Sequence, residues 1–279
     1  MNRSVPFSIS RLSAIAENTF REAVRQRLFL LLLLLAAAML ASARLFREFN
    51  FGSSELKFIA DFGFGALVLF GSTLTITATA QLFFSEIENR TALTLLAKPV
   101  WRTEFIFGKL LGVLGVVGVF CVLTTLLLAG LLFHREGELM ALQPDAFLDG
   151  RVIHYGDVML AGLLQWMKFG VLSAFTLLIA TYARSGLFTV ISGFFVLLIC
   201  HLQYIARDAY SQVTSPVLQF LVRVLGLAFP NFQLFNVTDQ VGEGGALDAF
   251  IVARTAAYAL VYVAVVGALA VHSFRHREI

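Results

Sequence analysis

Six long apolar stretches occupy most of this chain, and they constrain its fold more than any other feature. An α-helix needs about 20 apolar residues to cross the hydrocarbon core of a bilayer. The stretches that reach or approach this length are 28–43, 58–84, 105–133, 158–183, 186–205 and 246–274. The first is the shortest, but residues 20–27 can extend it. The pattern therefore predicts six transmembrane helices.

The composition leaves too little charge for a soluble protein of this size. Hydrophobic residues make up 58% of the 279 residues and charged residues only 14%, with a mean hydropathy of +0.82. Such a chain cannot surround one core with a polar shell, so the bilayer must serve as its solvent. Cys121 and Cys200 lie inside apolar stretches and are interpreted as core residues. We expect one all-α integral membrane domain over residues 1–279, surrounded by membrane lipids and without a nucleic-acid partner.

Residues 9–27 precede the first apolar stretch and have an amphipathic pattern. Apolar side chains recur at helical spacing, with charged residues between them, at Ile9, Leu12, Ile15, Phe20, Ala23 and Val24. This pattern predicts a helix lying in the cytoplasmic interface of the membrane. The alternative is a cleaved signal peptide ending near Ala41-Ser42-Ala43. The length of the preceding segment and its acidic residues, Glu17 and Glu22, argue against cleavage.

The distribution of lysine and arginine predicts the orientation. With the amino terminus inside, the inner segments carry more of these residues than the outer loops, although the outer loops are longer in total. Both termini are then cytoplasmic. The apolar stretch 216–229 lies between Pro216 and Pro230 and is too short to span, so it predicts a re-entrant or interfacial helix on the outer side. A seventh span is the alternative, but the basic carboxyl-terminal residues favour the cytoplasm.

The segment 85–104, between the second and third stretches, is charged and faces the cytoplasm in this topology. Glu86, Glu88 and Arg90 are expected to open a short helix, which Pro99 ends. Apolar residues at i, i+3 and i+4 give this helix one apolar face. Arg102 and Lys109 are expected at the lipid head groups where the third span begins. The segment suits docking to a soluble partner, and an ordinary solvated loop is the alternative.

Motifs for catalysis by the chain itself are missing from the sequence. It contains no G-x-x-x-x-G-K-[ST] phosphate-binding loop, no H-E-x-x-H zinc motif and no G-x-S-x-G nucleophile turn. We therefore expect no enzyme activity, no metal site and no cofactor bound by this chain.

The segment from Glu86 to Lys109 resembles the loop after the second helix of ABC type-2 transporter permeases. The matching residues are Glu86, Glu88, Arg90, Thr91, Leu95, Lys98, Pro99, Arg102, Glu104, Phe105, Gly108 and Lys109. The amphipathic segment 14–22, the six spans and Pro230-Asn231 before the last span also match. The chain is most similar to the single-domain bacterial members, the group that includes the permease of nitrous-oxide reductase maturation.

The resemblance implies an exporter membrane subunit in a prokaryotic cytoplasmic membrane. It would form a dimer with a second copy or a paralogue and pair with separate ATPase subunits, which bind ATP and Mg²⁺. A coupling helix in the second-to-third loop would dock on the ATPase. The residues implied to contact the ATPase are Glu86, Glu88, Arg90 and Thr91, with Lys98 and Arg102 at the rim and Glu17, Arg21 and Arg25 on the amphipathic helix.

Several polar residues within the spans are candidates for a translocation path. Thr73, Thr77 and Gln81 share one face of the second span. That face lines either a path or the dimer seam, or it only packs against another helix. Lys168 lies in the fourth span with Gln165 on the same side, and Asp61 is a possible counter-ion. If that span begins nearer Met167, Lys168 instead reaches the outer head groups.

Two other functions remain open from the sequence. An ion-coupled secondary transporter or channel would use Lys168 and Asp61. A membrane assembly factor would pass force from a cytoplasmic ATPase to a partner outside, through the longer outer loops.

Overall fold

The computed structural model describes residues 7–43, 55–88, 101–147, 150–211, 216–238, 240 and 247–275. The elements in these ranges are all helical. They are α1 (Ile9–Arg25), α2 (Arg27–Ser42), α3 (Glu55–Glu88), α5 (Arg102–Leu142), η2 (Pro144–Phe147), α6 (Tyr155–Tyr182), α7 (Gly186–Ser211), α8 (Pro216–Ala228), η3 (Phe232–Phe235) and α10 (Ala249–Arg275).

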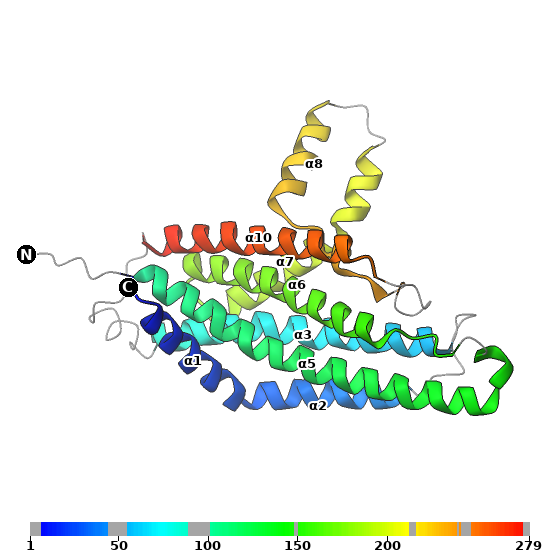
Figure 1. The fold of residues 1–279 in the computed structure, drawn as a ribbon. Coiled ribbons are helices and arrows are strands. Elements are labelled where there is room, and N and C mark those ends of the chain that lie inside the picture. Colours follow the sequence, from blue (N-terminus) through cyan, green and yellow to red (C-terminus); the bar gives the residue numbers. More distant parts are fainter. Residues whose placement is uncertain are drawn as a thin grey trace, which may run out of the picture.

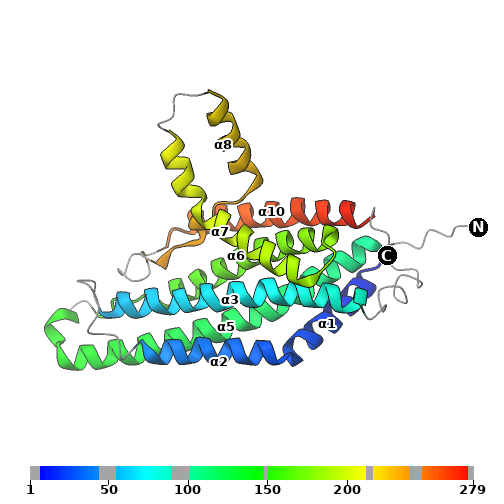
Figure 2. The same cartoon turned by 180° about the vertical axis from the view of Figure 1, so that it is seen from behind.

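The long helices form one elongated bundle (Figure 1). α6 is the most buried of them and contacts α3, α5, α7 and α10, while α2 packs on α3 and α5. α7 and α10 expose most of their surface, and Figure 2 shows α7 beside α6 on the rear face. The start of α1, the start of α5 and the end of α10 meet at one end of the bundle, which we call the α1 end.

Within the described ranges, five helices are long and apolar enough to cross a membrane: α3, α5, α6, α7 and α10. α2 meets the same criterion only together with α1, from which it is bent by 61°. The bend lies at Gln26, whose backbone is extended, with φ −67° and ψ 134°. The prediction of an all-α integral membrane protein is confirmed, and the separate amphipathic helix before the first apolar stretch is observed as α1.

Glu86 and Glu88 do not open a new helix, and the rest of the predicted helix falls in residues 89–100, outside the described residues. Both Glu86 and Glu88 belong to the last turn of α3, which continues without a break from Glu55. No glycine or proline follows Phe84 to end the helix there. α5 is also longer than the predicted span 105–133, because it runs from Arg102 to Leu142.

α8 projects away from the bundle and packs on α7 (Figure 1). Its 13 residues cover about 20 Å at 1.5 Å per residue, well short of a bilayer core. α8 is therefore a short helix and not a seventh span. Its last turn is held by Tyr262, whose hydroxyl donates to the Leu227 carbonyl at 3.0 Å.

α1 packs against two glycines of α5, Gly108 and Gly112, which we call the glycine seam. A Cβ atom added at Gly112 would lie 2.7 Å from the Ala16 carbonyl oxygen, and one added at Gly108 would lie 2.7 Å from Ile15 Cγ2. Glycines four residues apart let two helix backbones approach closely, as in helix pairs within membranes. Thr19 and Ala23 are the buried residues of α1 in this contact. Part of the apolar face predicted for this segment, including Ile15 and Phe20, is therefore packed on α5, whereas Ile9 is exposed.

Candidate functional site

Glu104 is the centre of a polar cluster at the α1 end. Its side chain is 0% exposed and forms an ion pair with Arg11 at 2.8 Å. It also accepts hydrogen bonds from the backbone N–H groups of Ser8 at 2.7 Å and Trp101 at 3.0 Å. Two of these partners belong to the start of α1 and the third is the cap of α5. One buried carboxylate therefore fixes the beginning of α1 to the beginning of α5.

Glu86 and Lys109 form a second buried pair, between the end of α3 and the first turns of α5. Lys109 Nζ lies 2.6 Å from Glu86 Oε1, and the lysine side chain is 2% exposed. A carboxylate in the last turn of a helix faces the negative end of the helix dipole, and the ammonium of Lys109 offsets that repulsion. Lys109 was expected at the lipid head groups, and that expectation is wrong because its side chain points into the bundle.

The pair changes the interpretation of Glu86. The residue was expected to contact an ATPase, but it is buried against a partner in its own chain. The two pairs enclose the ends of the segment between α3 and α5, since Glu86 precedes it and Glu104 follows it. Arg90, Thr91 and Lys98 lie outside the described residues, as does the side chain of Glu88.

Arg102 connects α5 to α10. Its guanidinium donates to the carbonyl of Phe274 at 2.8 Å and to that of Arg275, so it caps the carboxyl end of α10. Beneath this polar layer, three buried rings from α3, α5 and α10 pack together. The Phe105 and Phe274 rings stack with centroids 5.6 Å apart, and the Phe83 ring packs edge-on against Phe274 at 5.9 Å.

The outward face of α1 carries the exposed charges at this end. Glu17 and Arg21 form an ion pair one helical turn apart, with 60% and 68% of their side chains exposed. Arg25, in the last turn, is exposed too. These are the three residues that the resemblance assigns to the amphipathic helix. They share one exposed surface of α1.

The polar strip of α3 divides into two faces. Thr73 and Thr77 donate their hydroxyls to carbonyls one turn back, at 2.8 and 2.6 Å, and Gln81 is exposed. The buried hydroxyls are instead those of Thr75 and Thr79, and Thr79 lies 3.0 Å from the Ser173 hydroxyl of α6. Because these hydroxyls bond to carbonyls of their own helix, packing within the bundle is enough to explain the threonines. A role in a translocation path stays a prediction for the outer face.

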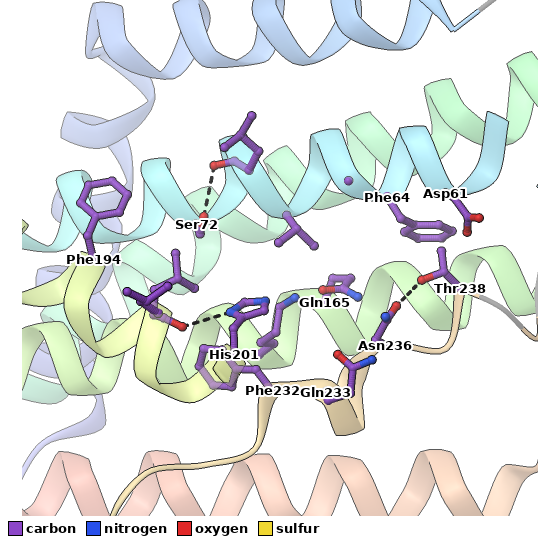
Figure 3. A pocket seen from close by; sticks show the side chains of 16 residues that line it. Asp61, Phe64, Ser72, Gln165, Phe194, His201, Phe232, Gln233, Asn236 and Thr238 are labelled. Carbon is purple, nitrogen blue, oxygen red and sulfur yellow. Dashed lines mark hydrogen bonds between the residues drawn. The ribbon is translucent and has the colours of Figure 1, made fainter. Parts of the chain in front are cut away.

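A pocket of about 790 Å³ lies between α3, α6, α7 and η3 (Figure 3). It brings together Asp61, Gln165 and Lys168, which the sequence had suggested as a group. Thr73, Thr77 and Gln81 do not line it. Pockets of ~300–1,000 Å³ with mainly apolar walls and a few convergent polar groups are typical of small-molecule sites. The full lining is Asp61, Phe64, Gly65, Val68, Leu69, Ser72, Gln165, Lys168, Phe194, Leu197, Leu198, His201, Phe232, Gln233, Asn236 and Thr238.

Lys168 lies at the middle of α6 and not near its end. α6 begins at Tyr155, so at 1.5 Å per residue Lys168 is about 20 Å from either end of the helix. The helix itself therefore does not begin near Met167, and the depth of Lys168 in the bilayer stays a prediction. The side chain is 2% exposed, and a lysine at this depth costs ~2.5–3.5 kcal/mol on insertion scales. Asp61, which is exposed at the rim of the pocket, forms no ion pair with it in the part of the chain that the structure describes.

Sequence reasoning missed several residues of both sites. Arg11, the ion-pair partner of Glu104, was not selected. A signal for Glu104 itself was present, because an acidic residue three positions after the N-cap, here Trp101, is typical of a capping box. His201 also lines the pocket, where its ring packs edge-on against Phe232 with centroids 5.6 Å apart. Asn236 and Thr238 come from the irregular segment after η3, which carried no signal.

Comparison with known proteins identifies the family. No curated protein matches the chain at a significant level. A family model described as "ABC-2 family transporter protein" matches residues 13–279, from the second turn of α1 to the carboxyl terminus. Because this match covers nearly the whole of a multi-pass helical membrane protein, the chain belongs to the ABC-2 transporter family and is a transport permease of that type.

Proposed function

We propose that this chain is the permease subunit of an ATP-binding cassette exporter, driven by ATP that a separate subunit hydrolyses. The chain itself binds no cofactor, and ATP and Mg²⁺ are held by the partner ATPase. It resides in the cytoplasmic membrane of a prokaryote with both termini inside, and it works as a dimer with a second copy or a paralogue. Membership of the ABC-2 family supports the transport class.

The observation that carries the proposal is the exposed charged face of α1, a helix that is held firmly against α5. Glu17, Arg21 and Arg25 are exposed, while the opposite face of α1 is packed into the glycine seam of α5. When a bound partner displaces a surface helix that is fixed in this way, the bundle moves together with the helix. The α1 end, with the segment between α3 and α5, is the docking surface for the ATPase.

Buried polar contacts connect this surface to three spans. Glu104 joins α1 to α5, Lys109 joins α5 to α3, and Arg102 joins α5 to α10. Movement of an ATPase bound at the α1 end would therefore displace α3, α5 and α10 as one unit. In the proposed cycle, this displacement changes the side of the membrane from which the substrate path is open.

The first test is affinity purification of the tagged protein in mild detergent, followed by mass spectrometry. We expect a stoichiometric partner with a phosphate-binding loop. If the protein is recovered without such a partner under conditions that preserve known complexes, the proposal of transport driven by a separate ATPase subunit fails.

A charge exchange in α1 tests the docking surface. The double variant Glu17→Arg/Arg21→Glu keeps the ion pair between neighbouring turns and reverses the charges shown to a partner. We expect it to lower recovery of the ATPase by about tenfold or more, because reversed charges at an interface cost several kcal/mol. Asp145→Arg, an exposed charge reversal at the opposite end of the bundle, serves as the control and should recover the ATPase normally. Equal recovery by both variants would exclude this face of α1.

A further inference from the structure

The pocket between α3 and α7 contains a buried cation that has no partner among the residues that the structure describes. Lys168 lines the pocket and is 2% exposed, and its ammonium forms neither a hydrogen bond nor an ion pair within the described ranges. The centroid of the Phe169 ring lies 5.6 Å from Nζ. Intramembrane lysines are expected to pair or to face a wet cavity. The ammonium is therefore available to something that enters the pocket.

Gln165, one turn before Lys168, adds a second unused polar atom. Its Nε2 donates to the carbonyl of Phe235 at 3.1 Å, which fixes the orientation of the amide. Its Oε1 is buried and has no hydrogen-bond donor within the described residues. Gln165 therefore lines the same cavity as the ammonium and is held in place there, and a ligand with an anionic group satisfies Lys168.

The rest of the lining selects the kind of anion. One wall is apolar and comes from α3 and α7, through Phe64, Val68, Leu69, Phe194, Leu197 and Leu198. A small inorganic ion would leave this wall against water. Phe194 and Leu198 are also 38% and 52% exposed, so the wall continues into the outer apolar surface of the bundle. Figure 3 shows Asp61 at one end of the pocket, away from His201, where its carboxylate disfavours an anion.

We propose that Lys168 binds the anionic head group of an amphiphile whose hydrocarbon tail packs on the apolar wall of α3 and α7. The head group bears a carboxylate or a phosphate, whose anionic oxygen accepts from the Lys168 ammonium. This inference rests on the proposed function, since it names the substrate class of the same permease. It is tested by binding alone, so a missing ATPase and a missing ligand are separate outcomes.

The experiment is photocrosslinking of the full chain in phosphatidylcholine nanodiscs. The probe is palmitate carrying a diazirine on its alkyl chain, and its methyl ester is the uncharged counterpart. We expect the acid to label peptides from α3, α6 or α7 in a saturable manner and the ester to label them weakly. Lys168→Met should weaken the apparent affinity about tenfold or more, since a hydrogen bond to a charged group is lost. Lys57→Met is the matched control, because Lys57 does not line the pocket, and it should bind as the wild type does.

Two further variants guard against a folding defect. Lys168→Arg keeps the charge and should retain most of the binding. Gln165→Glu places a carboxylate beside the ammonium, and this internal pair should displace the acid probe while the protein stays folded.

A parallel arm uses photoactivatable phosphatidylglycerol. Lys168-dependent labelling by that lipid but not by palmitate identifies a bilayer lipid, and the reverse identifies a free amphiphile. Equal labelling by acid and ester, or by wild type and Lys168→Met, would overturn the proposal and leave a water-filled pocket.

Discussion

The buried pair between Glu86 and Lys109 gives a sharp prediction about stability. Lys109→Met removes the ammonium and keeps an unbranched side chain of similar length. It leaves the Glu86 carboxylate in a site where the side chain is 10% exposed. Removing one partner of a buried ion pair costs about 3–5 kcal/mol, because the remaining buried charge loses that partner. For a chain of this size, that cost corresponds to roughly 6–20 °C in the unfolding midpoint.

The double variant Glu86→Leu/Lys109→Met separates charge from packing. Replacing both members of a buried pair with apolar residues is often neutral or stabilising. We therefore expect the double variant to unfold near the wild-type temperature, well above the single variant. Arg25→Met, which removes an exposed cation from the same end of the bundle, should shift the midpoint by less than about 1–2 °C.

The assay uses the two cysteines of the chain. Cys121 and Cys200 are free thiols with 3% and 0% exposure, so a thiol-reactive dye fluoresces only as the bundle opens. Unfolding midpoints in detergent are compared at one scan rate, because unfolding of such proteins is usually irreversible. A single variant as stable as the wild type, or a double variant as unstable as the single one, would refute the assignment of a buried ion pair.

Three other variants probe contacts that hold the bundle together. Gly112→Val would push against Thr19, whose Cβ would lie 2.5 Å from the new Cβ, and should cost about 1–3 kcal/mol and increase hydrogen exchange in α1; unchanged exchange would show that the seam is loose. Glu136→Ala removes the buried carboxylate that accepts from the Ile153 N–H at 3.1 Å. Hydrogen exchange of the backbone before α6 should become faster, and the free energy of unfolding should fall by about 1–3 kcal/mol. Unchanged hydrogen exchange would contradict the contact. Phe105→Ala should lower stability by about 3–5 kcal/mol in the thiol assay, because it empties the centre of the aromatic cluster; a loss below 1 kcal/mol would mean that this cluster is not a packed core.

The helices themselves could be predicted well from the sequence, and their ends less well. The stretch 186–205 and the helix α7 begin at the same residue, and the amphipathic segment 9–27 became α1. Errors occurred where charges follow an apolar run. Glu86 and Glu88 were assigned to a new helix, but α3 continues through them because nothing in the local sequence breaks it and Lys109 neutralises Glu86.

The candidate sites could be predicted only in part. Lys168 was recognised because its charge is costly wherever it lies in the span, and Gln165 followed from helical spacing. The expected counter-ion, Asp61, lines the same pocket without pairing with Lys168. Lys109 was placed at the lipid surface because it lies near the end of a span. Its orientation into the bundle depends on the rotation of α5 about its axis, which a uniformly apolar helix does not encode locally.

The sequence by itself determined the solvent, the secondary structure and the resemblance to a family, because hydropathy, helical length and a short loop pattern are local properties. Only the tertiary structure decided which polar groups meet. Arg11 and Glu104 are 93 residues apart, yet their ion pair fixes the α1 end. Gln165 and Phe235 are 70 residues apart, yet the hydrogen bond between them fixes the orientation of the Gln165 amide in the pocket. Such contacts depend on how each helix is turned and which helices become neighbours, and these are set by packing between distant parts of the chain.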